Sequence, residues 1–255
     1  MNSKNKNESL EGYFLLFGST LVYKTSSLYQ NIYVTERSEF QGMRGKFRLL
    51  QFSSNDVQGI INLDQKQYLV VSYIRVLVDL INHFVSAFKN GFIIGHGIGT
   101  ISSHYSDRNI LTAEIDPIVV EVSKQYFGHT GKNVVVGDGQ ALLKTQDSHS
   151  EDFIILDAFS GTETPYHLTT KEFFTLTNDK LSENGILIMN YIGKVRNDER
   201  LETLYTTISG IFPDVKLFAT NPKKSSKQNI FIVASRSELG DYSPQEAAPF
   251  QIMVK

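Results

Sequence analysis

A group of closely spaced glycines directly follows a short apolar segment in the middle of the chain. Residues 92–94 read Phe-Ile-Ile, and Gly95-His96-Gly97-Ile98-Gly99 comes next. Glycine has no Cβ atom, so the backbone can turn sharply there and approach a ligand closely. Glu114 lies 19 residues after Gly95, at the end of a second apolar segment. An acid at this spacing is placed to bind both hydroxyls of a ribose. The pair predicts a parallel sheet that holds a nucleoside-containing cofactor at one edge.

The spacing of the glycines also bears on the class of cofactor. The pattern G-x-G-x-G is one residue shorter than the G-x-G-x-x-G pattern that binds a pyrophosphate, and no second phosphate-binding turn follows. S-adenosylmethionine carries a ribose and an adenine but no pyrophosphate, so it does not need a helix N-terminus as an anion site. We therefore favour S-adenosylmethionine or a relative over NAD. A glycine-rich turn without any ligand is the alternative.

Composition excludes several classes of protein. The chain has 255 residues, 41% of them hydrophobic, which suits one large or two unequal domains. Its net charge of −2 provides no field that would attract nucleic acid or an anionic membrane. It has no cysteine, which excludes disulfides and Cys-ligated zinc and fits a reducing cytoplasm. The longest apolar stretch, Tyr68–Phe88, contains Arg75, Asp79 and His83, so we expect no membrane span.

The N-terminal part predicts a small antiparallel β-domain over residues 1–67. Its first ten or so residues are polar, contain no secretory signal and are expected to be disordered. Short apolar or alternating segments then predict strands, with Gly18-Ser19 as one of the breaks between them. The predicted strands are Tyr13–Phe17, Leu28–Thr35, Lys46–Phe52 and Gly59–Leu63.

Residues 68–255 predict a second, Rossmann-like domain. Apolar residues recur at helical spacing over residues 69–88, which predicts an amphipathic helix. Strands and helices then alternate. The predicted strands are Phe92–Gly95, Ile110–Ile115, Asn133–Val136, Asp152–Leu156, Gly185–Tyr191, Val215–Thr220 and Ile230–Ser235. The predicted helices are Ser102–Ser106, Pro117–Phe127, Gly139–Thr145, Lys171–Leu181 and Asp198–Phe212.

The order of these elements predicts the fold class. The connection at residues 221–229 is too short for a crossover helix, so the last two strands should form a hairpin with one antiparallel edge strand. Seven strands in a mostly parallel sheet with a C-terminal antiparallel hairpin describe the α/β fold of the class I S-adenosylmethionine-dependent transferases. We therefore predict that fold, preceded by the small N-terminal β-domain.

Carboxylates follow three neighbouring strands of this predicted sheet. Ligands bind at the carboxyl ends of parallel strands. Glu114 can accept both ribose hydroxyls, and Asp138 can accept from the adenine amino group, with Gly139 leaving room for the base. Asp157, one strand further, can take a proton from an incoming amine, because an amine must be neutral to attack. Each carboxylate has an alternative role as a helix N-cap, which applies most to Asp116 and Asp138.

The segment from Gly91 to Tyr191 resembles the spermidine/spermine synthase family of aminopropyltransferases. Upstream, Ser27–Ile32 is similar to the family's S-x-Y-Q-x-I strand, and Leu63 to Gln67 to its L-D-G-x-x-Q turn. The resemblance covers about residues 25 to 195. The other matching stretches are Gly95–Gly99, Ala113–Pro117, Tyr126-Phe127, Val136–Gly139 and Ile154–Asp157.

The resemblance implies a role for each residue of the site. Asp157 would be the general base, and the family's known members are often homodimers. Residues that would hold S-adenosylmethionine or its decarboxylated form are Gln30, Gly95, Gly97, Gly99, Glu114, Ile115, Asp138 and Gly139. Residues that would contact the acceptor are Tyr29, Tyr73, Tyr166 and His167. No His, Asp or Glu cluster has metal-ligand spacing, so no metal is expected.

The chain also departs from the family pattern. Ile98 stands where polyamine synthases have an aspartate that binds the aminopropyl amine. The family's Y-H-E or Y-Q-E triplet is Tyr73-Ile74-Arg75 here, and the second aspartate of the catalytic D-S-S-D-P segment is missing, with Glu163 as a nearby acid. These changes remove charges that would bind a polycation.

The sequence thus predicts a cytoplasmic enzyme, an alkyl transferase of the S-adenosylmethionine type. Our first hypothesis is transfer of an aminopropyl group from decarboxylated S-adenosylmethionine to a small amine. The alternatives are a small-molecule methyltransferase, and a nucleoside-binding protein that has lost catalysis. A nicotinamide oxidoreductase is a more distant possibility. Neither nucleic acid nor a membrane is expected as a partner.

Overall fold

The computed structural model describes residues 18–53, 56–161 and 163–252, and these form two compact units. Unit 1 comprises the residues up to Val71 together with Gly97–His104 and Asp116–Gly131. Unit 2 comprises Ser72–His96, Tyr105–Ile115 and the chain from Lys132 onward. The predicted strand at residues 13–17 and the predicted disorder of the first ten residues lie outside the described residues. The predicted domain division after residue 67 stays a prediction.

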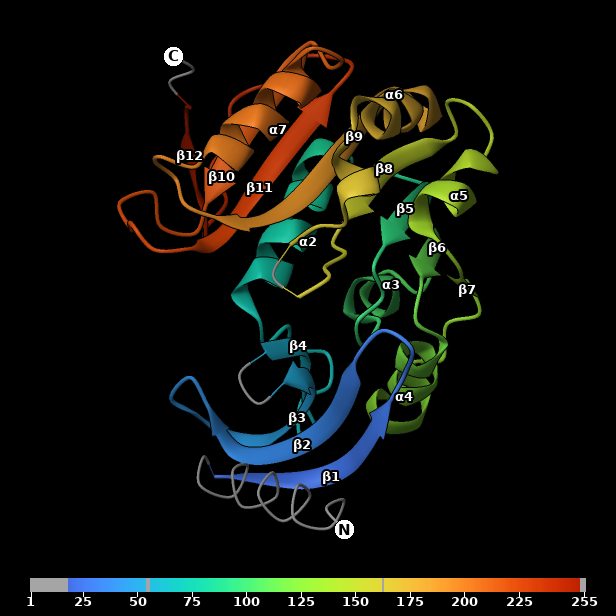
Figure 1. The fold of residues 1–255 in the computed structure, drawn as a ribbon, viewed down its shortest axis with the longest axis vertical. Coiled ribbons are helices and arrows are strands. Elements are labelled where there is room, and N and C mark those ends of the chain that lie inside the picture. Colours follow the sequence, from blue (N-terminus) through green and yellow to red (C-terminus); the bar gives the residue numbers. More distant parts are fainter. Residues whose placement is uncertain (1–17, 54–55, 162, 253–255) are drawn as a thin grey trace. The chain divides into compact units, whose positions relative to one another are not determined.

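Unit 1 is built on a four-stranded antiparallel sheet in the order β1-β2-β3-β4 (Figure 1). The strands are β1 (Ser19–Ser26), β2 (Asn31–Phe40), β3 (Met43–Ser53) and β4 (Asp56–Asn62). Two helices belong to the same unit, α3 (Thr100–His104) and α4 (Pro117–Phe127). Apolar side chains of the sheet pack with those of α4 in one cluster, whose buried members are Ile32, Val34, Leu50, Ile98, Val119, Val122 and Phe127.

Two predictions for this sheet were wrong in detail. Residues 27–30 form a turn in which the Ser27 amide donates to the Gln30 carbonyl at 2.9 Å, so β2 begins at Asn31 and not at Leu28. The strand β1 was missed, because Gly18-Ser19 was interpreted as a break. Only one face of β1 is even partly covered, so its sequence carries many polar residues and little strand signal.

Unit 2 contains a sheet of eight strands, in the order β12-β10-β11-β9-β8-β5-β6-β7. The strands are β5 (Asn90–Ile94), β6 (Asn109–Glu114), β7 (Val134–Val136), β8 (Glu151–Leu156), β9 (Leu181–Gly193), β10 (Asp214–Ala219), β11 (Gln228–Ser235) and β12 (Ala248–Phe250). The helical segments of the unit are α2 (Ser72–Phe84), α5 (Gly139–Lys144), η1 (Tyr166–Thr169), α6 (Lys171–Lys180) and α7 (Glu199–Ser209).

The predicted class I transferase fold is confirmed, with two differences in the sheet. It has eight strands, because β12 pairs with β10 at the edge. The antiparallel strand β11 is not at the edge as predicted, since it lies between β9 and β10 and is antiparallel to both. The physical reason is composition. Residues 230–234 of β11 are all apolar and are wholly buried, whereas the first half of β10 contains Asp214 and Lys216 and is partly exposed, so β11 takes the inner position.

The helix α2 begins and ends inside its predicted range of 69–88. A C-terminal segment binds its polar side. Arg75 forms an ion pair with Glu246, and the ring of Tyr242 stacks on that of His83 with centroids 3.8 Å apart. Burial and a hydrogen bond to Asp79 raise the pKa of Tyr242 to about 12. The polar stripe of α2 is therefore an internal contact surface.

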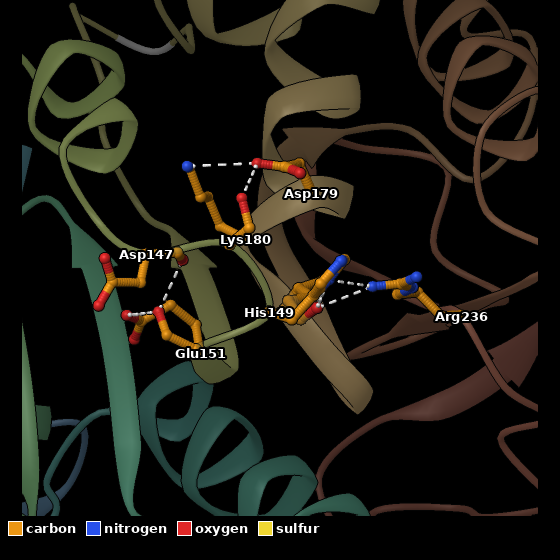
Figure 2. Close-up of polar contacts among 9 residues, drawn as sticks. Asp147, His149, Glu151, Asp179, Lys180 and Arg236 are labelled. Carbon is orange, nitrogen blue, oxygen red and sulfur yellow. Dashed lines mark hydrogen bonds and ion pairs between the residues drawn. The ribbon is translucent and has the colours of Figure 1, made fainter.

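The amino ends of β8 and β9 carry a polar cluster, shown in Figure 2. Arg236 donates to Nδ1 of His149 at 2.6 Å and to the Leu181 carbonyl at 3.0 Å. Lys180 pairs with Asp179 at 3.2 Å, and hydrogen bonds from Ser148 and Lys180 lower the pKa of Asp179. Because these ends lie opposite the carboxyl ends of the parallel strands, the cluster stabilises the sheet away from the predicted site.

Candidate functional site

Four neighbouring parallel strands end at the same edge of the unit 2 sheet, in the order β8-β5-β6-β7. Backbone hydrogen bonds continue beyond the strands themselves. The Asp157 amide donates to the Ile94 carbonyl, and the Gly95 amide donates to the Ala113 carbonyl, both at 2.9 Å. The Gly137 amide donates to the Glu114 carbonyl at 2.8 Å. The predicted residues that follow these strands are therefore held in one row.

Gly95 allows the closest approach in this row. Its φ is +102°, a conformation that residues with a Cβ rarely adopt. A Cβ atom at this position would lie 2.2 Å from the Asp157 carbonyl oxygen. The glycine is therefore required by the contact between the ends of β5 and β8.

Glu114 is oriented by the backbone of the glycine turn. The His96 amide donates to Oε2 of Glu114 at 2.9 Å. The carboxylate is thus held beside the turn, where a ribose was predicted to bind. His96 itself is only 6% exposed. Ile115, the next predicted residue, is 44% exposed.

Both oxygens of Asp138 accept hydrogen bonds within the protein. Oδ1 accepts from the Ala141 amide at 2.9 Å, which makes Asp138 the N-cap of α5. Oδ2 accepts from Nε2 of His167 at 2.8 Å. The alternative role of Asp138 as a helix N-cap is therefore correct. Because Oδ2 already accepts from His167, an adenine amino group would have to share that oxygen with the histidine. The structure also explains Gly139 by packing, since a Cβ there would lie 2.3 Å from Cγ2 of Ile94.

Asp157 lies half-buried directly after β8. Burial raises its pKa to about 6, although a hydrogen bond from Nδ2 of Asn190 at 2.8 Å acts to lower it. Burial and the negative charge of Asp157 raise the pKa of Tyr73 well above its ordinary value of 10.0. The structure thus places Tyr73 of α2 within electrostatic range of Asp157, as a neutral phenol.

The loop after Asp157 is held by contacts of its own. Ser160 and Glu163 form an isolated antiparallel bridge, and Glu163 pairs with Arg200 of α7 at 2.5 Å. The charge of Glu163, the acid near the position of the missing aspartate, is therefore already paired with Arg200. Tyr166 further along the loop is 82% exposed.

Four of the predicted site residues belong to unit 1: Tyr29, Gln30, Gly97 and Gly99. Nε2 of Gln30 donates to Oδ2 of the fully buried Asp116 at 3.3 Å. Asp116 also accepts from the Ser27 hydroxyl at 2.5 Å and caps α4 through the Ile118 amide. Asp116 thus ties the turn before β2 to the start of α4, a long-range role that its local sequence does not reveal.

The remaining predicted residues of unit 1 lie in exposed or turn positions. Tyr29 is 53% exposed, and the φ values of Gly97 and Gly99 are +54° and +78°. Ile98, between these glycines, is only 8% exposed and packs so closely on β4 that a Cβ at Gly59 would lie 2.6 Å from its Cγ2. Isoleucine at this position therefore serves the apolar core of unit 1.

Two absences can be stated for the described part of the chain. Among residues 18–53, 56–161 and 163–252, no group of three or more His, Cys, Asp or Glu side chains is arranged to hold a metal ion. Over the same residues, every helix is too short or too polar to cross a membrane.

The site also contains residues that the sequence analysis did not select. Asn190 is 2% exposed at the carboxyl end of β9, and Asn229 of β11 donates to its side-chain oxygen at 3.0 Å. A polar residue in the apolar strand β9 was a usable signal for Asn190. No local feature of the sequence marked Asn229, because its place beside Asn190 depends on the pairing of β11 with β9.

Comparison with known proteins agrees with this geometry. The family model of the spermine/spermidine synthase domain matches residues 71–243. The polyamine aminopropyltransferase of Vibrio vulnificus is 29% identical over 219 residues, which cover 80% of this chain and 70% of that protein. The N-terminal histidine N-methyltransferase of Emericella nidulans is 32% identical over 148 residues, 51% of this chain but only 24% of that protein.

A solved structure described as a probable spermidine synthase from Corynebacterium glutamicum has the same fold. It superposes with a TM-score of 0.75 at 21% identity, covering 88% of this chain and 83% of that one. At this level of identity the structural likeness shows the fold. The family model spans more than half of the chain, and on that ground the chain belongs to the spermine/spermidine synthase family, whose members are alkyl transferases of the S-adenosylmethionine type.

Proposed function

We propose that this protein transfers an aminopropyl group from decarboxylated S-adenosylmethionine to a small amine, with Asp157 as the general base. The observation that carries the proposal is the half-buried carboxylate of Asp157 at the end of β8, whose pKa is raised to about 6. Such a group is mostly ionised at neutral pH and is still basic enough to accept a proton. The likeness to the polyamine aminopropyltransferase of V. vulnificus supports aminopropyl transfer as the reaction.

The residues at the strand ends fit the nucleoside of the donor. Glu114, oriented by the His96 amide, would accept the ribose hydroxyls. The exposed side chain of Ile115 would lie against the adenine, and Oδ2 of Asp138 would accept from the adenine amino group. Gln30 and the glycines of the turn stay predicted contacts of the same ligand.

The residues around Asp157 suit the chemistry of the transfer. When bound, the sulfonium donor supplies an electrophilic carbon, to which the amine nitrogen bonds as the carbon–sulfur bond breaks. Asp157 takes the proton that this nitrogen loses. Tyr73 is a neutral phenol at any working pH and can orient the amine by a hydrogen bond without adding charge.

The charges of the site favour an acceptor with a single cationic nitrogen. Glu163 in the loop is paired with Arg200 at 2.5 Å, and Arg75 is paired with Glu246. By the resemblance to the family, Ile98 stands where polyamine synthases have an aspartate, so the chain lacks that carboxylate. A second ammonium group would therefore meet a neutralised acid, so we propose small monoamines ahead of polyamines.

The proposal is tested by titrating the protein with S-adenosylmethionine and with its decarboxylated form in a calorimeter, followed by a transfer assay on a panel of amines. We expect tighter binding of the decarboxylated form and an aminopropylated product, identified by mass spectrometry. Absence of turnover with both donors across the panel would contradict it.

Methyl transfer is the second candidate, and the likeness to the histidine N-methyltransferase favours it. The mass of the product distinguishes it from aminopropyl transfer in the same assay. A silent nucleoside-binding protein would instead keep its affinity in Asp157→Asn and show no turnover in either form. A homodimer and a cytoplasmic location stay predictions from the resemblance and the composition, and light scattering tests the first.

We predict that His167→Ala raises the affinity for S-adenosylmethionine about two- to tenfold, because the histidine no longer occupies Oδ2 of Asp138. Calorimetry at neutral pH measures the change. The matched control is Thr169→Ala in the same helical turn, whose hydroxyl bonds only to the Tyr166 carbonyl among the described contacts, and it should leave the affinity unchanged. Weaker binding by His167→Ala would show that the histidine and the adenine contact Asp138 together.

A further inference from the structure

A chain of side-chain hydrogen bonds runs from Asp157 across three strands of the sheet. Asn190, at the end of β9, donates through Nδ2 to Oδ1 of Asp157 at 2.8 Å. Asn229, on the antiparallel strand β11, donates through Nδ2 to Oδ1 of Asn190 at 3.0 Å. The middle amide is only 2% exposed, so its own donor and acceptor are shielded from water.

The two bonds fix the direction in which the Asn190 amide points. If the amide were flipped, its oxygen would face the carboxylate of Asp157 and its NH2 group would face that of Asn229. Both contacts would be repulsive, since each would pair two acceptors or two donors. The acceptor-only carboxylate of Asp157 selects the NH2 group of Asn190, and Asn229 supports this orientation by donating to the Asn190 oxygen.

We propose that Asn190 and Asn229 are positioning residues, which hold Asp157 so that its Oδ2, and not its Oδ1, takes the proton from the attacking amine. This inference rests on the proposed function. Oδ1 is engaged by Asn190, so the second oxygen is the one available to the amine. The hydrogen bond also stabilises the charged carboxylate, which keeps Asp157 ionised despite its burial.

The surroundings of Asp157 make this effect measurable. Tyr73 on α2 is a titratable side chain in electrostatic range of Asp157, and it stays neutral because its own pKa is raised. The neighbouring strand ends contribute the Gly95 backbone on one side and the uncharged Asn190 on the other. Burial and the hydrogen bond from Asn190 are the two causes that set the pKa of Asp157, so loss of that bond should change its titration.

The test is the pH dependence of kcat/KM in Asn190→Leu, a substitution of similar size that removes the donor. We expect the acid limb of the pH profile to move up by about one pH unit, which lowers kcat/KM about fivefold near pH 6 and hardly at all above about pH 8. A merely structural role would lower the rate by the same factor at every pH.

Substitutions of Asn229 test whether it acts through Asn190. Asn229→Asp keeps the shape but reverses the preference of the Asn190 amide, so it should move the limb further than Asn229→Leu. Adding Asn229→Leu to Asn190→Leu should produce no further shift, because the two residues form one chain. If the shifts of the acid limb in the two single variants added up in the double variant, Asn229 would not act through Asn190.

A matched control exists on the same sheet. Nδ2 of Asn109 on β6 donates to Oδ1 of Asn90 on β5 at 2.9 Å, at the amino ends of the strands. Asn109→Leu removes a similar amide pair there and should leave the acid limb unchanged. An equal shift in this control would mean that any lost amide pair perturbs the sheet.

A measurement without turnover separates this inference from the proposed function. The stability difference between the protein and its Asp157→Asn variant follows the titration of Asp157, and it requires no acceptor. With Asn190→Leu in both proteins, the pH midpoint of that difference should rise by about one unit. An unchanged midpoint would overturn the role of Asn190, whereas a shifted midpoint in an inactive protein would refute only the proposed reaction.

Discussion

Asp157→Asn is expected to abolish transfer while making the protein more stable above neutral pH. Loss of the base should lower kcat by about 10²–10⁴-fold. The variant keeps the shape of the side chain, and its oxygen can still accept from Asn190. Single-turnover kinetics at saturating donor measure the loss.

The gain in stability follows from the titration of Asp157. Its folded-state pKa of about 6 lies above the ordinary value of 3.8, so the folded state binds the proton more tightly than the unfolded state does. The buried charge therefore costs nothing below about pH 4, and its cost grows until the pH passes about 6. We expect Asp157→Asn to raise the free energy of unfolding by about 1–2 kcal/mol near pH 8, allowing for partial exposure of the side chain.

Urea unfolding at about pH 4 and pH 8 measures this difference. The two proteins should be nearly equal in acid and should separate in alkali. If Asp157→Asn were only as stable as the unchanged protein, or less stable, at both pH values, the charge of Asp157 would not destabilise the fold.

Gly95→Ala is expected to be the most damaging single methyl group that can be added at the site. The new Cβ would lie 2.2 Å from the Asp157 carbonyl oxygen, and the φ of +102° would be strained as well. We expect a loss of about 3–5 kcal/mol in the free energy of unfolding, because neither strand end can move without breaking the ladder.

Gly128→Ala is the matched control for backbone strain. Its φ is +71°, at the C-cap of α4, but nothing lies within 4 Å of an added Cβ. It should cost only about 1 kcal/mol. If Gly95→Ala cost no more than this control, the close contact with Asp157 would have no energetic weight.

Elements with local signals could be predicted from the sequence. The helix α4 has its predicted bounds because Asp116 caps it, Pro117 starts it and Gly128 ends it. Buried parallel strands such as β5 and β8 were found because both of their faces are apolar.

Features that depend on pairing across the chain could not be predicted. The place of β11 inside the sheet depends on its pairing with β9 and β10, and its fully apolar residues 230–234 were the one local sign of that position. The same applies to the site. Asp157 was found as a polar residue after an apolar strand, whereas Asn229 reaches it only through the register of β11 and β9.

The C-terminal segment on α2 has a consequence for how the chain is made. Glu246 follows its partner Arg75 by 171 residues. At roughly 5–20 residues per second, a ribosome would add Glu246 about 10–30 s after Arg75. Through nearly all of that interval the polar stripe of α2 lacks both Tyr242 and Glu246, and the helix that carries Tyr73 acquires its final surroundings only after these residues have been added.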